Sequence, residues 1–190
     1  MAIATSLPYT GNDDADRLIA TDPLALLIGF ALDQQVTVQK AFSGPWELRQ
    51  RLGHLDAGKI AATDSAELDR VFRERPALHR FPGSMAGKVQ ALCAAIARDY
   101  GGDAGRIWGE AATGADLQQR LLALPGIGEM KARTIIAVLG KQLGVHPAGM
   151  DAVMPAHPTL GDVDTPEALA AYQAGKRAVK AAMRAQGKRV

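Results

Sequence analysis

The segment LPGIGEMKARTIIAVLG, residues Leu124 to Gly140, decides how the rest of the sequence is interpreted. Its proline and two glycines lie at the start of a strongly helical run, behind another helical stretch. Gly126 and Gly128 can take backbone angles closed to other residues, which favours a tight turn between two helices. The N–H groups at the start of the second helix would then point outwards together, with the positive end of the helix dipole behind them. The pattern predicts an anion site that suits one phosphate of a nucleic-acid backbone, with an ordinary helix–helix corner as the alternative.

The spacing of apolar residues is helical along almost the whole chain. Asp22 is a candidate N-cap, Pro23 fits the first helical position, and apolar residues then recur at three and four residues up to Leu32. No segment alternates apolar and polar residues for long, as a strand would. We therefore predict an all-α protein. Its further helices are expected at Pro45 to Leu52, Ser65 to Glu74, Ala86 to Tyr100, Ala115 to Leu122, Glu129 to Leu143 and Pro166 to Gln186, with an irregular loop from Gly144 to Asp164.

Composition excludes several classes of site. With 190 residues, 47% of them hydrophobic, the chain can bury a core as one unit. Cys93 is the single cysteine, so no disulfide, cysteine-rich zinc site or four-cysteine iron–sulfur cluster can form within one chain. The four histidines lack metal-ligand spacing, and we expect them at the surface or in loops. No segment resembles a secretion signal or a membrane span, so we expect a soluble, cytoplasmic protein that does not bind membranes.

The net charge of +2 is unevenly distributed along the sequence. The last 19 residues carry six basic and no acidic side chains: Lys176, Arg177, Lys180, Arg184, Lys188 and Arg189. Four of these follow at four-residue steps and would share one face of a helix. The face is either solvated or a stripe that contacts phosphates.

LPGIGEMKARTIIAVLG resembles the helix-hairpin-helix of the helix-hairpin-helix/Gly-Pro-Asp (HhH-GPD) superfamily of DNA base-excision glycosylases, the group of endonuclease III. DPLALLIGFALDQQVT (Asp22 to Thr37) resembles the early helix of that family, and Gln35 falls on its glutamine. MAGKVQALCAAIARDYGG (Met85 to Gly102) resembles its helix that opens on a Lys-Ala-like pair. The segments DQQV, AFSGPW and RFPGSMAGK resemble those of a small bacterial subgroup of this superfamily that has no iron–sulfur cluster.

The resemblance implies a two-lobed helical fold with the helix-hairpin-helix at about residues 117–143. Residues 1–190 would form one unit, with a central lobe at 31–134 and a second lobe made from residues 1–30 and 135–190. The implied partner is double-stranded DNA, bound by a monomer in the cytoplasm at the nucleoid.

The resemblance also implies roles for individual residues. Gly126, Ile127 and Gly128 would grip phosphate, Ile127 also plugging the groove between the two helices. Gln35 would fill the gap that a flipped base leaves, although an exposed glutamine at a helix end often has no role. Lys88 and Lys131 would add phosphate contacts.

Asp151, 25 residues after Gly126, lies near the position of the catalytic aspartate of the family, a few residues later than usual. It would stabilise the positive charge that develops on the deoxyribose and orient the attacking water. It is also a candidate N-cap. The following residues AVMPAHPTLG depart from the family, because Pro155 and Pro158 would break the expected helix or restrict it to a short turn. Asp162 and Asp164 are alternative carboxylates on the same loop.

Met130 argues against strand cleavage. Family members that also cut the DNA backbone carry a nucleophilic lysine two residues after the second hairpin glycine, and here that residue is Met130. Lys131 is rotated by about 100° around the helix and is expected to contact phosphate or solvent. Met130 could line the base pocket or belong to the core. The resemblance allows a monovalent cation at the hairpin, and we expect no other cofactor.

The sequence therefore predicts a monofunctional DNA N-glycosylase of base-excision repair without a β-lyase step. One alternative is a catalytically inert helix-hairpin-helix protein that binds damaged or distorted duplex DNA. Another is a protein-interaction module that has lost DNA binding.

Overall fold

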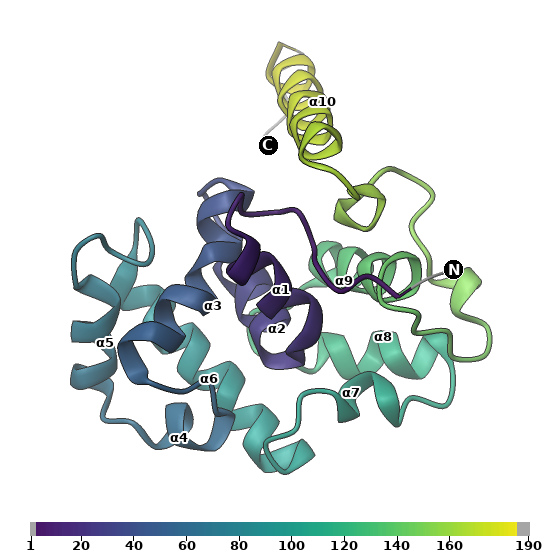
Figure 1. The fold of residues 1–190 in the computed structure, drawn as a ribbon. Coiled ribbons are helices and arrows are strands. Elements are labelled where there is room, and N and C mark those ends of the chain that lie inside the picture. Colours follow the sequence, from purple (N-terminus) through teal and green to yellow (C-terminus); the bar gives the residue numbers. More distant parts are fainter. Residues whose placement is uncertain (1–2, 186–190) are drawn as a thin grey trace.

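The computed structural model describes residues 3–185, except for the side chain of Lys180. Within them no β-strand forms, and a single isolated bridge pairs Thr113 with Ala148. The predicted all-α class is confirmed. The elements are α1 (Asp13–Thr21), α2 (Pro23–Leu32), α3 (Val38–Leu52), α4 (Ala57–Ala62), α5 (Ser65–Arg73), α6 (Pro82–Tyr100), α7 (Arg106–Gly109), α8 (Gly114–Leu122), α9 (Glu129–Lys141), the 3-10 turns η1 (Met150–Ala152) and η2 (Leu160–Asp162), and α10 (Pro166–Ala185) (Figure 1).

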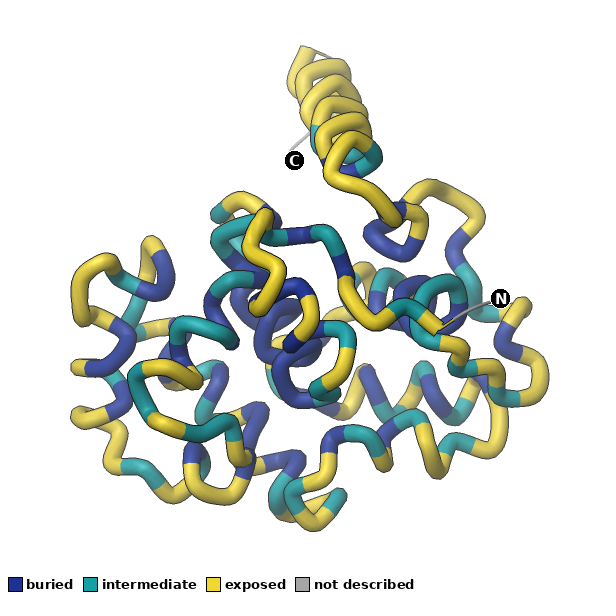
Figure 2. The backbone as a smooth tube through the Cα atoms, viewed as in Figure 1, coloured by how far each residue is buried: buried dark blue, intermediate teal, exposed yellow. Residues whose placement is uncertain are grey.

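Helix α2 is the centre of the core. The Asp22 side chain caps it by accepting hydrogen bonds from the N–H groups of Leu24 and Ala25, and Pro23 occupies the first turn. Every residue from Leu24 to Leu32 is buried, which Figure 2 shows as a continuous dark segment. Such a helix needs neighbours on all sides, and α1, α3 and α6 pack around it.

Two glycines allow α2 and α3 to approach closely. A Cβ atom at Gly29 of α2 would lie 2.5 Å from the ring of Phe42 on α3. A Cβ atom at Gly44 of α3 would lie 2.4 Å from the side chain of Leu32 on α2. A larger residue at either position would therefore require the Phe42 ring or the Leu32 side chain to shift.

Several helix boundaries differ from the predicted ones. Helix α3 begins at Val38, capped by Thr37, and runs through Pro45 instead of starting there. Pro45 removes one backbone donor, but Gly44 and Phe42 before it and Leu48 after it are buried against the core. Helix α6 begins at Pro82 instead of Ala86, and α1, α4 and α7 were not predicted.

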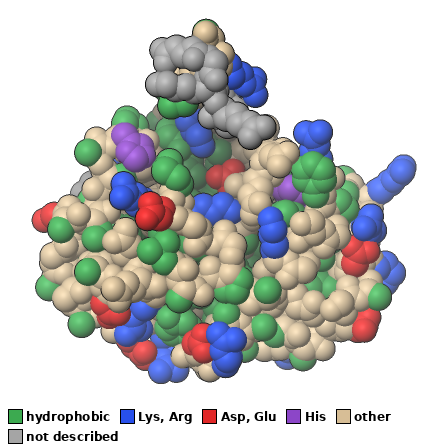
Figure 3. Space-filling model, turned by 180° about the vertical axis from the view of Figure 1, so that it is seen from behind, with side chains coloured by type: hydrophobic (Ala, Val, Ile, Leu, Met, Phe, Trp, Pro, Cys, Tyr) green, Lys and Arg blue, Asp and Glu red, His purple; other side chains and the backbone are tan. Residues whose placement is uncertain are grey.

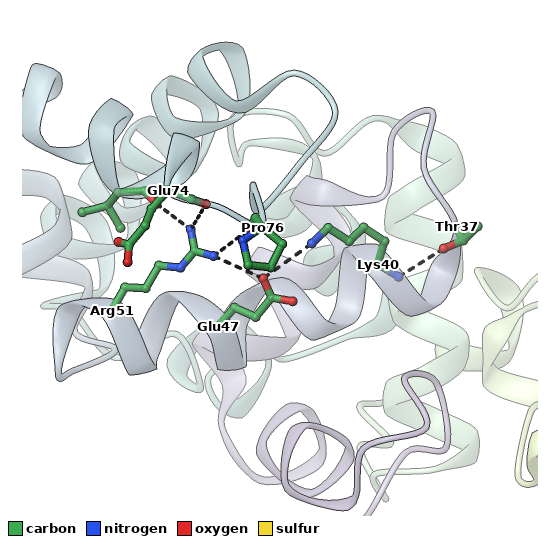
Figure 4. Close-up of polar contacts among 7 residues, drawn as sticks. Thr37, Lys40, Glu47, Arg51, Glu74 and Pro76 are labelled. Atoms are coloured by element: carbon green, nitrogen blue, oxygen red, sulfur yellow. Dashed lines mark hydrogen bonds and ion pairs between the residues drawn. The ribbon is translucent and has the colours of Figure 1, made fainter.

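A polar cluster on α3 fixes the chain that follows α5 (Figure 4). The guanidinium of Arg51 donates to the carbonyls of Val71, Glu74 and Pro76 at 2.7, 3.0 and 2.6 Å. Glu47 lies 3.7 Å from Arg51 and 3.5 Å from Lys40. Helix α3 thus helps to hold the segment that leads from α5 to α6.

Helix α10 projects from the rest of the molecule (Figure 1). Leu169 is buried near its start, whereas the described side chains from Ala174 onwards are exposed. Lys176 and Arg184 of the predicted basic stripe, and Arg177 beside it in the sequence, are among these exposed side chains. Lys188 and Arg189 lie outside the described residues, as does the Lys180 side chain.

In the part of the chain that the structure describes, none of the helices has the length and apolar character needed to cross a membrane. The predicted division into a central lobe at residues 31–134 and a second lobe from both ends stays a prediction.

Replacing Gly29 with alanine tests the α2–α3 contact. Gly29→Ala should lower the free energy of unfolding by about 1–3 kcal/mol, because the added methyl group overlaps the Phe42 ring. Gly87 is the matched control, since it lies in α6 with nothing within 4 Å of an added Cβ. Gly87→Ala should raise the free energy of unfolding by up to about 1 kcal/mol through helix propensity. Thermal unfolding of both variants checks this, and equal shifts in one direction would contradict the close contact.

Candidate nucleic-acid interface

The turn between α8 and α9 has the geometry of a tight hairpin. Gly126 has a φ angle of +82°, in the left-handed region that favours glycine, and Gly128 precedes the first residue of α9. The side chains of Leu124 and Ile127 are buried, and the Ile127 N–H donates to the Leu124 carbonyl at 3.2 Å. The side chain of Ile127 therefore anchors the turn in the core, as the sequence predicted, while its N–H is used within the turn.

The start of α9 offers unused backbone donors. No side chain caps this helix, and its first backbone hydrogen bond joins the Ala132 N–H to the Gly128 carbonyl. Among the described residues, the N–H groups of residues 128–131 have no acceptor. Together with the helix dipole they form a positive end that suits an anion.

The four residues that carry these donors, 128–131, line an open hollow of about 730 Å³. Its lining is completed by Leu122, Leu124, Gly126 and Ile127 of the hairpin and by Gln34 and Lys88, and Glu129 is its one acidic residue. Met130, whose side chain is 70% exposed, and Leu122, also exposed, form an apolar part of its rim. Residues from α6, from the turn after α2 and from the hairpin thus meet at one surface.

Two lysines of the hollow are held by backbone and amide oxygens. The Lys88 ammonium donates to Gln34 Oε1 at 2.7 Å. The Lys131 ammonium lies 3.4 Å from the Ala31 carbonyl and 3.5 Å from the Gly126 carbonyl. Burial lowers the pKa of Lys131, and the positive charge of Lys88 lowers it further. The negative charge of Asp33 acts in the opposite direction and raises this pKa. Lys131 therefore joins the hairpin to the end of α2 and does not simply extend into solvent.

Asp33, which sequence reasoning did not select, lies in the same turn. Burial raises the pKa of its carboxyl group, and the charges of Lys176 and Lys131 oppose the shift. The signal available in the sequence was its position, directly after an entirely apolar helix and two residues before Gln35. The turn after α2 thus holds one partly buried carboxylate on which the charges of lysines from α9 and α10 act.

Gln35 is exposed and has an unusual backbone. Its φ angle of 56° makes it the one non-glycine residue with positive φ in the described part of the chain. Such a conformation costs of order 1 kcal/mol and persists where surrounding contacts enforce it. The Gln35 side chain is exposed, and the residue before it, Gln34, lines the hollow.

His79 contacts the backbone of the turn that leads to Gln35. Its Nε2 lies 3.1 Å from the Leu32 carbonyl and 3.0 Å from the Gln34 carbonyl, while Nδ1 accepts from the Phe81 N–H at 3.0 Å. This pattern requires a neutral ring with its proton on Nε2. Burial lowers the pKa of His79, and this effect outweighs the hydrogen bonds to the two carbonyls, which raise it. His79 lies in a loop, as predicted, but is only 2% exposed, and it was missed as a positioning residue.

Asp151 lies away from the hairpin. It is exposed in η1, which packs against the start of α8: a Cβ atom at Gly114 would meet Met150 at 2.5 Å. The hairpin follows the other end of α8, whose nine residues span roughly 13 Å. The structure therefore does not bring Asp151 together with Gly126, Lys88, Lys131 and Gln35.

The segment after Asp151 forms only short turns, in keeping with the effect expected of Pro155 and Pro158. Asp162 is engaged in a capping box with Thr159 and an ion pair with Lys141 at 2.5 Å. Burial raises the pKa of Asp162, but these contacts outweigh it and lower the pKa overall. Asp164 is exposed.

In residues 3–185, no group of three or more histidine, cysteine or acidic side chains is arranged to hold a metal ion. A monovalent cation at the hairpin stays a prediction from the resemblance. In comparisons with protein-family models and with curated proteins, neither a family nor a relative matched this chain.

Replacing His79 with phenylalanine tests the support of the turn. His79→Phe should lower the free energy of unfolding by about 1–3 kcal/mol, because two buried carbonyls lose their donor. The folded state disfavours protonated His79, so this residue stabilises the wild type above pH 6.5. That contribution is lost as the pH falls from 6.5 through the lower pKa of the folded state.

Urea unfolding at pH 7.5 and 5.5 measures this effect, with His157→Phe, a change at an exposed histidine, as the control. The wild type and His157→Phe should lose more stability between the two pH values than His79→Phe. An equal loss in all three proteins would show that the ring is not held in its neutral form.

Proposed function

We propose that this protein is a monofunctional DNA glycosylase of base-excision repair, an HhH-GPD enzyme that binds duplex DNA and flips a damaged base. The observation that carries the proposal is the convergence of three features at one surface. These are the open N-terminus of α9, the lysines Lys88 and Lys131, and the strained, exposed Gln35. It acts as a monomer at the nucleoid in the cytoplasm and needs no iron–sulfur cluster.

Phosphate binding follows from the charge and hydrogen bonding of the hairpin. Unused backbone N–H groups and a helix dipole favour an anion, and the two ammonium groups beside them raise the local positive potential. Contacts of this kind position a protein on the DNA backbone without reading its sequence. They suit an enzyme that has to scan many undamaged base pairs.

Base flipping requires a side chain that enters the duplex in place of the base. Gln35 is exposed, carries an amide that can bond to the unpaired partner base, and has a backbone fixed by its neighbours. Leu122 and Met130 add exposed apolar area to the hollow, which suits contact with bases. Met130 would line the pocket for the flipped base.

Hydrolysis without strand cleavage follows from the residue at the nucleophile position. Met130 replaces the family lysine there and extends outwards. Lys131 is directed to the carbonyls of Ala31 and Gly126. A carboxylate is still needed to stabilise the sugar cation, and the resemblance assigns this role to Asp151.

The alternative, an inert protein that binds distorted duplex DNA, is favoured by one observation. Asp151 lies about a helix length from the hairpin. The two functions share the phosphate site and differ in whether base is released.

Binding of duplex DNA should depend on Lys88 and Lys131. For Lys88→Gln and Lys131→Gln we expect weaker binding and a slope of log affinity against log salt reduced by about one unit each, since each change removes one phosphate contact. Lys59→Gln, at an exposed position on α4, is the control and should change neither. Fluorescence anisotropy across a salt series measures both quantities. The absence of any salt-dependent affinity for the duplex would indicate the protein-interaction module instead.

Base release is the direct test of the enzyme. The full chain is incubated with duplexes that carry deaminated, oxidised or alkylated bases, and abasic sites are then cut with alkali. We expect free base and alkali-dependent strand breaks for at least one lesion. We expect neither breaks before alkali nor a covalent adduct after borohydride. Tight binding with no release from any duplex would favour the inert DNA-binding protein.

A further inference from the structure

The turn after α2 carries a carboxylate, Asp33, between two residues that contact lysines of the hairpin hollow. Ala31, two residues before Asp33, has its carbonyl 3.4 Å from the Lys131 ammonium. Gln34, directly after Asp33, lines the hollow and accepts from Lys88. Asp33 is therefore fixed between two contacts that belong to the proposed DNA-binding surface.

The setting of Asp33 differs from that of a structural carboxylate. Partly buried carboxylates are normally hydrogen-bonded or paired, because removing the charge from water is costly. Buried Asp16 follows this rule, accepting from the N–H groups of Tyr9 and Thr10. Among the described residues, by contrast, none forms a hydrogen bond or an ion pair with the Asp33 carboxylate.

Basic groups from separate helices act on Asp33 from a distance. Lys131 belongs to α9 and Lys176 to α10, and both favour the charged form of the carboxyl group. Gln39 and Gln173 exchange hydrogen bonds of 3.4 and 2.8 Å, which hold α10 against α3 and thus bring Lys176 near the turn. On the face opposite that of Figure 1, Figure 3 shows acidic and basic side chains close together in a hollow.

We propose that Asp33 is the carboxylate that acts in base release at the hairpin hollow. This inference rests on the proposed glycosylase function and replaces Asp151 in that role. The bond between the sugar C1′ and the base nitrogen breaks, and its electron pair leaves with the base. The Asp33 carboxylate faces the developing sugar cation and takes a proton from the water whose oxygen bonds to C1′. The departing base takes a proton from solvent, and Asp33 returns its own to solvent, so water and nucleotide give free base and an abasic site.

The electrostatics of the turn suit this role. Burial makes the Asp33 carboxyl group a stronger proton acceptor by raising its pKa, while the lysines keep the charged form accessible. The charged groups around it are Lys131 and Lys176, with Lys88 bonded to the neighbouring Gln34. His79, beneath the same turn, has a lowered pKa.

Comparison of Asp33→Asn, Asp33→Glu and Asp151→Asn in the full chain tests the proposal. Single-turnover release from the lesion duplex that the wild type processes should be about 100-fold slower or more for Asp33→Asn, the usual size of a lost acid–base group. Duplex affinity should be unchanged or higher, since a negative charge near phosphate is removed. Asp33→Glu should recover part of the rate. Asp13→Asn, a change at an exposed carboxylate of α1, is the control and should stay within about threefold of the wild type.

The pH profile separates catalysis from a structural role. The carboxylate is the active form, so wild-type release should fall as the pH drops through the Asp33 pKa, which lies above 3.8. This acid limb should persist in Asp33→Glu and disappear from the residual rate of Asp33→Asn. Thermal unfolding shows whether each variant is folded, and if Asp33→Asn is not, Asp33→Glu and the wild-type acid limb decide.

Three outcomes would overturn the inference. Release by Asp33→Asn at the wild-type rate would exclude Asp33, and a large loss in Asp151→Asn alone would return the role to Asp151. If the wild type releases no base from any duplex, the proposed function itself fails, and the inference fails with it. The activity of the wild type distinguishes this last case from the other two.

Discussion

The structure depends on how the C-terminal end of α2 is satisfied. This helix is buried along its length and has no basic residue in its last turn, so its terminal carbonyls need other donors. The Gln34 amide donates to the Ala31 carbonyl at 3.0 Å. Further donors come from distant parts of the chain. His79 serves Leu32 and Gln34, and Lys131 approaches Ala31. One helix end therefore ties together the loop before α6, the hairpin and the turn that carries Gln35.

The conformational costs of the molecule concentrate at this junction. Gln35 has a left-handed backbone, Asp33 is a partly buried carboxylate, and Lys131 is partly desolvated next to another ammonium group. Each of these features opposes folding, whereas the α2–α3 contact a short distance away is packed without polar groups. Strain and unpaired charge that persist on a rigid support are typical of functional sites. The hairpin and the turn after α2 are therefore best understood as two halves of one surface.

Local signals in the sequence predicted much of this fold. Asp22 and Pro23 start α2 as expected, and Gly126 takes the positive φ that its position in LPGIG indicates. Non-local contacts could not be predicted in the same way. His79 supports carbonyls 45 and 47 residues earlier, and Asp33 gains its unusual setting from helices that follow it by about a hundred residues or more. We predicted that α3 would start at Pro45, whereas it starts at Val38. The error arose because a proline inside a helix depends on tertiary packing, here the burial of Pro45 and its neighbours in the core.

The distance between Asp151 and the hairpin is also a consequence of packing. The chain after α9 is fixed by the Lys141–Asp162 ion pair and by the hydrogen bond of 2.9 Å from Gln142 to the Gly161 carbonyl. Gly161 lies so close to α9 that a Cβ atom there would be 2.5 Å from the backbone of Ala137. At the other end of this loop, just before η1, the Ala148 carbonyl accepts a hydrogen bond of 2.9 Å from the Gly114 N–H. Bringing Asp151 to the start of α9 would break contacts at both ends of the loop. The turn after α2 already contacts the hairpin through Lys131, so a carboxylate from this turn could act at the hairpin without breaking such contacts.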